Sequence, residues 1–308
     1  MRLAILDFGT NTFNLLIAEN TEDKKVKFLY SSKEPVKLGE GGINDKILHD
    51  DAIERALKAI AKHYLSIRSF KADKIYAFAT SAIRDAKNSK LFLKRVQEIF
   101  DLYVHIIPGE REAELIYKGV RLACNFSEEK NLITDIGGGS IEFIIADRQK
   151  TYWIESYDLG MARMLERFKP EDPISQNTVE NLKNYFSEQL SPVFEAVEKF
   201  KPTALVGASG SYETFYEIIK RQLPKKYSNN GRPGKEIILE DFRGLHQNLL
   251  LSTIEERKNM PGMEPVRVEM IVLASIFVNF TLENWKFEKM LYSEYALKEG
   301  IIAEILNI

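Results

Sequence analysis

The sequence predicts two α/β domains that are related by duplication and face each other across a cleft. Three observations support this fold class. The chain has 308 residues, which is long for one hydrophobic core, since domains usually hold roughly 100 to 200 residues. Strand-like and helix-like apolar patterns alternate along the chain. A strand–turn–strand pattern at the N-terminus also recurs 128 residues later.

The first half reads as βββαβαβα. We expect strands at 3–7 and 13–18 around a turn at 8–12, and a third strand from 26 to 30 that extends toward residue 38. Asp50 or Asp51 is expected to cap a helix that runs to about Ser69. The remaining elements are a strand at 74–79, a helix at 89–100, a strand at 103–107, and a helix after Pro108-Gly109.

The second half begins in the same way, with strands at 132–135, 141–146 and 151–157, then helices and a strand at 204–207. The C-terminal region is helical at 241–251, 266–282 and 294–306, with a short strand at 289–292. The longest apolar run, 270–280, is far shorter than the roughly 20 residues that cross a bilayer. It predicts a buried helix, and we expect no membrane role.

The repeat aligns without a gap. ILDFGTNTFNLLIA placed over ITDIGGGSIEFIIA pairs Asp7 with Asp135, Gly9 with Gly137, and Thr12 with Ser140. We therefore expect one domain at 1–124 and another at 125–308, with a C-terminal helix from about 298 to 308 that packs back on the first domain.

Composition excludes several classes of protein. The single cysteine, Cys124, forms no internal disulfide, and without a recognisable signal peptide the chain is expected in the cytoplasm. A net charge of −2 argues against a protein that coats nucleic acid. The histidines lack metal-binding spacing; they are His49, His63, His105 and His246.

Three turns have a composition suited to phosphate: DFGTNT, DIGGGS and GASGS. Glycine lets a ligand approach the backbone, and successive N–H groups and hydroxyls form concavities that bind anions. None is a Walker A loop. Each turn alone could be merely a tight hairpin, but together they predict a bipartite phosphate clamp. The candidate phosphate-binding residues are Gly9, Thr10, Asn11, Thr12, Gly137, Gly138, Gly139, Ser140, Gly207, Ser209, Gly210 and Ser211.

Asp7 and Asp135 each end an apolar strand, where a buried carboxylate needs a partner or a cation. Mg²⁺ takes oxygen ligands and bridges to substrate phosphates, so both are candidate metal ligands. Each could instead bond its own turn. Glu142 points away from Ile141 and Phe143 on its strand, so it could ligate metal or orient water.

Further charged residues lie near the expected cleft. Glu110, Glu112 and Glu114 open the helix after Pro108-Gly109, either as an ordinary acidic helix start or with one carboxylate beside an attacking water. Arg84 follows the strand at 74–79, where it could bind phosphate or form a surface pair with Asp85. The basic loop 224–235 is either a solvated connection or a flap that attracts an anionic substrate.

The segments DFGTNTFNLLI, PVKLGEG, ATSAIRDAKN, PGEREAELIYKGV, DIGGGSIEF, YDLG, GASGS and YALKEGI together resemble the exopolyphosphatase and guanosine pentaphosphate phosphohydrolase family. This resemblance runs from residue 1 to the last helix. It implies two duplicated RNase H-like domains, as in the acetate kinase, sugar kinase and actin superfamily. It also implies Mg²⁺-dependent release of the terminal phosphate of inorganic polyphosphate or of guanosine pentaphosphate.

The resemblance also implies roles for particular residues. Glu112 matches the base that activates water, and Glu142 is implicated in metal and water placement. Gly138, Gly139, Ser140, Thr10, Asn11 and Arg84 match positions that hold phosphate. Arg111 and Glu114 depart from the family's charge pattern, which bears on substrate preference. Longer members of the family add a C-terminal helical domain, whereas here we expect only the two core domains.

Two other functions are consistent with such a superfamily. One is a kinase that transfers phosphate from ATP to a small acceptor, and the other is an actin-like ATPase that forms filaments. Phosphate release without an acceptor separates the first from a hydrolase, and light scattering on adding nucleotide detects the second. We expect a homodimer through the exposed face of the C-terminal helices.

Overall fold

The computed structural model describes residues 1–21, 26–126, 128–227, 231 and 233–308. The first half contains β1 (Arg2–Phe8), β2 (Thr12–Asn20), β3 (Val26–Pro35), α1 (Asp50–Ser69), β4 (Lys74–Ala79), α2 (Ser81–Asp85), α3 (Ser89–Phe100), β5 (Val104–Ile106) and α4 (Gly109–Ala123). The second half begins with β6 (Asn131–Ile136), β7 (Ile141–Ala146), β8 (Thr151–Tyr157), α5 (Met161–Phe168), α6 (Gln176–Gln189) and α7 (Ser191–Phe200). It continues with β9 (Ala204–Ala208), α8 (Ser209–Gln222), β10 (Gly234–Ile237), α9 (Leu239–Leu251), α10 (Ile254–Lys258), a 3₁₀ turn (Pro265–Arg267), α11 (Ile271–Asn284), β11 (Lys289–Ser293) and α12 (Leu297–Leu306).

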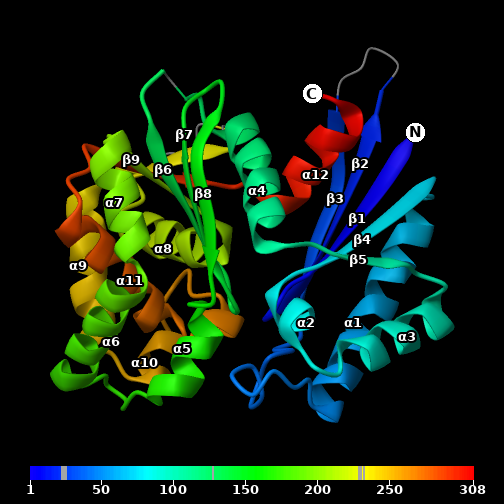
Figure 1. Cartoon of the computed structure of the whole chain (residues 1–308), viewed down its shortest axis with the longest axis horizontal. Helices are drawn as coiled ribbons and strands as arrows, with labels where there is room; N and C mark the ends of the chain where they lie inside the picture. The colour runs from blue at the N-terminus through cyan, green and yellow to red at the C-terminus, as the bar shows by residue number, and fades with distance from the viewer. Residues whose placement is uncertain (22–25, 127, 228–230, 232) are drawn as a thin grey trace.

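The two sheets, which lie side by side in Figure 1, share one topology. Among the described residues the first sheet has the strand order β3-β2-β1-β4-β5, and the second has β8-β7-β6-β9-β11 with β10 added at its edge. In each sheet the first three strands are antiparallel, and the next two, β4 and β5 or β9 and β11, run parallel to the first. The edge strand β10 runs antiparallel to β11. The fold therefore consists of two duplicated RNase H-like domains, as expected.

The repeat also holds at the level of single hydrogen bonds. Asp7 pairs with Asn14 across β1 and β2, and Asp135 pairs with Glu142 across β6 and β7. The N–H of Gly9 donates to the Thr12 carbonyl at 3.2 Å, and the N–H of Gly137 donates to the Ser140 carbonyl at 3.0 Å. Each turn is thus closed by the same bond at the same offset, so the gapless alignment is confirmed.

Helices α4 and α12 lie between the two sheets (Figure 1). Their apolar faces form one core with Ile5 of β1 and Ile133 of β6, which buries surface from both halves. The helices cross at Gly119 and Gly300, where a Cβ on Gly119 would lie 1.9 Å from the Ala296 carbonyl oxygen. Glycine permits this close crossing because it has no side chain. Helix α12 also packs on β1 and β2.

Some element boundaries differ from those predicted. The N-cap of α1 is His49, which forms no side-chain cap, so neither Asp50 nor Asp51 caps the helix. Both lie in the first turn, where their negative charges interact favourably with the helix dipole. The predicted helix at 266–282 begins at Ile271, because a 3₁₀ turn at Pro265–Arg267 precedes it. The last helix begins at Leu297 rather than at 294.

Three short elements, α2, α10 and β10, were not predicted. Helix α11 is buried on all sides, as expected for the apolar run at 270–280. No helix within the described ranges has both the length and the apolar character that spanning a membrane requires.

Candidate active site

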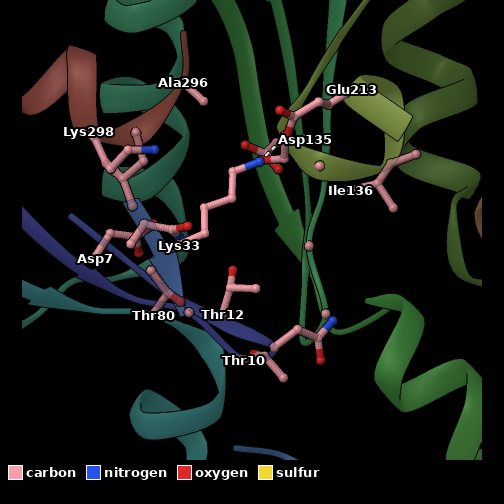
Figure 2. A pocket seen from close by; sticks show the side chains of 18 of the residues that line it. Asp7, Thr10, Thr12, Lys33, Thr80, Asp135, Ile136, Glu213, Ala296 and Lys298 are labelled. Atoms are coloured by element: carbon pink, nitrogen blue, oxygen red, sulfur yellow. Dashed lines mark hydrogen bonds and ion pairs between the residues drawn. The ribbon is translucent and has the colours of Figure 1, made fainter. Parts of the chain in front are cut away.

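A cavity of about 430 Å³ lies between the two halves and is lined by both (Figure 2). Nearly all of the predicted site residues line it: Asp7, Gly9, Thr10, Asn11, Thr12, Glu112, Asp135, Gly137, Gly138, Gly139, Ser140, Glu142, Ser209 and Gly210. The predicted residues Arg84, Gly207 and Ser211 are not part of this lining.

In the first glycine turn the backbone carbonyls are bonded to the segment that follows β3, whereas two backbone N–H groups are not bonded to any described residue. The Asn11 carbonyl accepts hydrogen bonds from the N–H groups of Val36 and Lys37 at 2.8 and 2.9 Å, and the Thr10 carbonyl accepts one from Leu38 at 2.7 Å. Among the described residues, the N–H groups of Thr10 and Asn11 have no acceptor. They remain free donors beside the cavity.

The second turn is held in the same way by the start of α5. The N–H groups of Met161 and Ala162 donate to the carbonyls of Gly137 and Gly138 at 3.0 and 2.8 Å. Because the carbonyls face α5, the N–H groups of Gly138 and Gly139 lack an acceptor in the described part of the chain. Both turns therefore present unpaired N–H donors, which is the arrangement that binds anions.

The two turns contact each other across the cavity floor. A Cβ on Gly138 would lie 2.5 Å from Nδ2 of Asn11, and a Cβ on Gly139 would lie 2.5 Å from Oγ of Ser81. A larger side chain at either position would have to displace Asn11, Thr10 or Ser81. The glycines of the second turn are thus required by close approach, and the two turns form one surface.

The third predicted turn is a strand-to-helix connection. Ser209 and Gly210 begin α8 at the cavity, and the Ser209 side chain forms a hydrogen bond with Asp135. Gly207 lies within β9 under the ring of Tyr212, and Ser211 is buried in the helix. Only the middle of GASGS therefore reaches the cavity.

Glu112 is the buried member of its acidic turn. It is 7% exposed, whereas Glu110 is exposed and Glu114 pairs with Arg111 at 2.6 Å. Burial raises the pKa of Glu112 well above its ordinary value, Glu142 raises it further, and Arg84 lowers it. Nη1 of Arg84 donates to Oε2 of Glu112 at 3.0 Å and to the Ile107 carbonyl at 3.2 Å. Arg84 thus stabilises the ionised form of Glu112, because a desolvated carboxylate needs a counter-charge.

The other carboxylates of the cavity repel one another. Burial raises the pKa of Asp135 to about 6 and that of Glu142 to about 7, and the charge of Asp135 contributes to the second shift. Burial also raises the pKa of Asp7, although Lys298 and a hydrogen bond from Asn14 oppose the shift. Clustered carboxylate oxygens of this kind are suited to a hard cation. The described residues contain no group of three such side chains close enough to hold a metal without other ligands.

The structure adds residues that sequence reasoning missed. Thr80 and Ser81, at the end of β4, line the cavity from the first half as Ser209 and Gly210 do from the second. Three cations also line it: Lys33, Arg267 and Lys298. Thr80, Ser81 and Lys298 lie within segments that carried the resemblance, ATSAIRDAKN and YALKEGI, so closer attention to those segments could have found them.

The three cations differ in their partners. Lys33 reaches across the cavity to Glu213 of α8, as Figure 2 shows, and lies 3.7 Å from Glu264. Arg267 is buried, and its Nε has no hydrogen-bond partner among the described residues but lies 3.7 Å from Oε2 of Glu264. Lys298, on the first turn of α12, forms no ion pair or hydrogen bond with any described residue, and nearby carboxylates raise its pKa against the effect of burial.

The basic loop 224–235 does not contribute to the described cavity. Lys226 pairs with Asp241 at 2.8 Å, and Lys235 lies on β10, 3.5 Å from Glu294. Arg232 and residues 228–230 lie outside the described residues.

Comparisons with known proteins agree with this geometry. The model of the Ppx/GppA phosphatase family matches residues 16–307. The crystal structure of an exopolyphosphatase from Cytophaga hutchinsonii is 33% identical, with a TM-score of 0.96 over 100% of this chain and 98% of that one. A PPX-GPPA enzyme from Aquifex aeolicus is 26% identical, with a TM-score of 0.80 over 99% of both chains. A putative exopolyphosphatase from Haemophilus influenzae is 26% identical over 97% of this chain and 90% of its own length.

Proposed function

The chain belongs to the Ppx/GppA phosphatase family, and we propose that it is an exopolyphosphatase, a hydrolase that releases the terminal phosphate of inorganic polyphosphate. The observation that carries this proposal is the meeting of two N–H-lined turns beside the buried carboxylate of Glu112. Phosphoryl transfer depends mainly on positioning and charge stabilisation, and this cavity is suited to both.

The terminal phosphate binds between the two turns. Its oxygens accept hydrogen bonds from the N–H groups of Thr10 and Asn11 on one side and of Gly138 and Gly139 on the other. Arg267 and Lys298 supply positive charge from the remaining walls. Lys298 is the better candidate of the two for this role, because it lines the cavity without any described ion-pair partner.

Glu112 acts as the base. It accepts a proton from water as the water attacks the terminal phosphorus, and the bond between that phosphorus and the bridging oxygen breaks. The raised pKa suits this role, since a base works best when its pKa approaches the working pH. Arg84 keeps enough of Glu112 ionised by pairing with it.

Asp7, Asp135 and Glu142 would hold Mg²⁺. Their oxygen atoms fit the ion. The carboxylates repel one another in a desolvated site, and a cation between them would relieve this repulsion. When bound, Mg²⁺ neutralises charge on the phosphate oxygens. We expect at most two of these three carboxylates to contact the ion directly and the third to reach it through water, with substrate oxygens as the other ligands.

Guanosine pentaphosphate is the second candidate substrate. The cavity lining includes Phe28 and Tyr295, whose ring centroids lie 5.2 Å apart. An aromatic surface of this kind offers a contact for a base, which polyphosphate lacks.

The deciding assay is phosphate release from long-chain polyphosphate and from guanosine pentaphosphate at matched concentrations of chain ends, with and without Mg²⁺. A higher kcat/KM on polyphosphate supports the proposal. A preference for guanosine pentaphosphate overturns the substrate assignment. If neither substrate releases phosphate, the proposal that the protein is a hydrolase is overturned. We expect a homodimer in the cytoplasm, which size-exclusion chromatography with light scattering and fractionation would check.

A further inference from the structure

Arg163, on the first turn of α5, joins the two halves by contacting Gly139 and Ser81, which both line the cavity. The residue is 4% exposed. Its Nε donates to the Gly139 carbonyl at 2.7 Å, which lies in the second glycine turn. Its Nη1 donates to the Ile43 carbonyl at 2.9 Å, and its Nη2 contacts Oγ of Ser81 at 3.2 Å and the carboxylate of Asp85, all in the first half.

The contacts continue from Asp85 to the base. Oδ1 of Asp85 lies 3.6 Å from Nε of Arg84, and Arg84 donates to Glu112. Charges alternate along this chain: the Arg163 cation, the Asp85 anion, the Arg84 cation and the Glu112 carboxylate. Every link is largely shielded from water, so each interaction is stronger than a surface ion pair.

Removing Arg84 takes away the cation that pairs with Glu112, and removing Asp85 leaves Arg163 with the more distant carboxylate of Asp158 at 3.6 Å. Such a loss is costlier than the net contribution of the intact pair. In the intact series from Arg163 to Glu112, every charged side chain therefore has a neighbour of opposite charge. In that arrangement the Gly139 carbonyl, and hence the direction of the turn's N–H groups, is fixed relative to Glu112.

We propose that Arg163 is a positioning residue, which through Asp85 and Arg84 sets the second glycine turn in register with Glu112. This inference rests on the proposed function. Arg163 itself touches no substrate. Its effect is on geometry, and displacing reacting groups by about 1 Å can reduce a rate about 100-fold.

The kinetic test compares R163K, R163M, D85N and the double variant D85N/R163K. We expect kcat to fall about 10-fold in R163K, which keeps the charge but not the fork, and about 100-fold in R163M, with KM changed less than about 3-fold. The loss in D85N/R163K should be smaller than the product of the single losses, because both changes break the same contact.

The matched control is R257K. Arg257 is also 4% exposed and bonds the Val268 carbonyl at 3.0 Å and Asp172 at 2.9 Å, but all its contacts lie within the second half. R257K should lower the melting temperature as much as R163K while keeping kcat within about 2-fold. A structural role for Arg163 predicts the same result for both variants, and equal kcat in R163K and R257K would overturn the proposal.

A second readout does not use catalysis. The amides of Met161 and Ala162 bond the carbonyls of the second turn, so their hydrogen exchange reports on its order. D85N, a change in the first half, should speed their exchange about 10-fold, whereas D172N should not. If the wild type releases no phosphate from either substrate, the proposed function fails and this measurement alone decides the coupling. Unchanged exchange in D85N would then reject it.

Discussion

Nη1 of Arg84 lies 3.0 Å from Oε2 of Glu112, which joins a cation on α2 to the buried carboxylate at the start of α4. The two residues are 28 positions apart in sequence. This pair opposes the rise that burial causes in the Glu112 pKa, so it favours the ionised form of the Glu112 carboxyl.

Glu112→Gln should reduce kcat by about 10² to 10⁴-fold, because the amide cannot accept a proton from water. Phosphate release under saturating substrate measures the effect. The matched control is Glu110→Gln in the same helical turn, which is exposed and should keep nearly full activity. A rate for Glu112→Gln close to that of the wild type would rule out Glu112 as the base.

Arg84→Met should move the acidic limb of the kcat profile to higher pH. The base must be ionised to work, so activity rises with pH through the Glu112 pKa. Removing the cation that lowers this pKa shifts the limb upward. Arg111→Met, which removes exposed pairs with Glu114 and Glu304, should leave the limb in place. A limb that stays fixed in Arg84→Met contradicts the pairing in solution.

Lys298→Met should lower kcat/KM by about 10 to 100-fold, since a desolvated phosphate loses a charged contact that contributes about 1.5 to 3 kcal/mol. Kinetics on polyphosphate measure the loss. Lys118→Met is the control, because Lys118 pairs with Glu304 at 2.8 Å on the same helix pair but does not line the cavity. Equal effects in the two variants would mean that Lys298 matters only for packing.

Glu142→Gln should stabilise the Mg²⁺-free protein above pH 7 while reducing activity. The folded pKa of Glu142 is about 7, above the ordinary value of 4.5. The folded state therefore binds more protons between these values, and stability declines as pH rises from about 4.5 to 7. The substitution removes this decline, which amounts to about 1 to 3 kcal/mol.

Denaturant unfolding in a chelator at pH 4 and pH 8 measures that difference. The variant and wild type should diverge only at the higher pH. Added Mg²⁺ should stabilise the wild type more than Glu142→Gln at pH 8. If the wild type is instead the more stable protein at pH 8 without Mg²⁺, Glu142 is not a strained carboxylate.

The hairpin turns could be predicted because their signal is local. Asp7, Gly9 and Thr12 lie in one contiguous stretch, and the same spacing recurs at Asp135. Strand pairing then places both turns at equivalent positions of two sheets with one topology. The residues of both turns that line the cavity could therefore be predicted from local sequence, the period of the strands and the chemistry of the turns.

The remaining residues depend on tertiary contacts that no local pattern encodes. Lys33 lies in a strand whose pattern indicates only an edge position, and Lys298 reaches the cavity because α4 and α12 cross at two glycines. The position of Arg84 after a strand predicted the correct neighbourhood but not its partner. That partner follows from burial of Glu112, which sequence does not show.

The packing of α12 has a consequence for how the protein acquires activity during synthesis. This helix follows every other described element in sequence, yet it fills the space between the sheets and carries Lys298 to the cavity. The N-terminal sheet can fold early on the ribosome, since domains tend to fold as they emerge. The cavity between the sheets, however, can take its final form only after α12 has left the exit tunnel, so we expect a nascent chain that still holds α12 in the tunnel to lack activity.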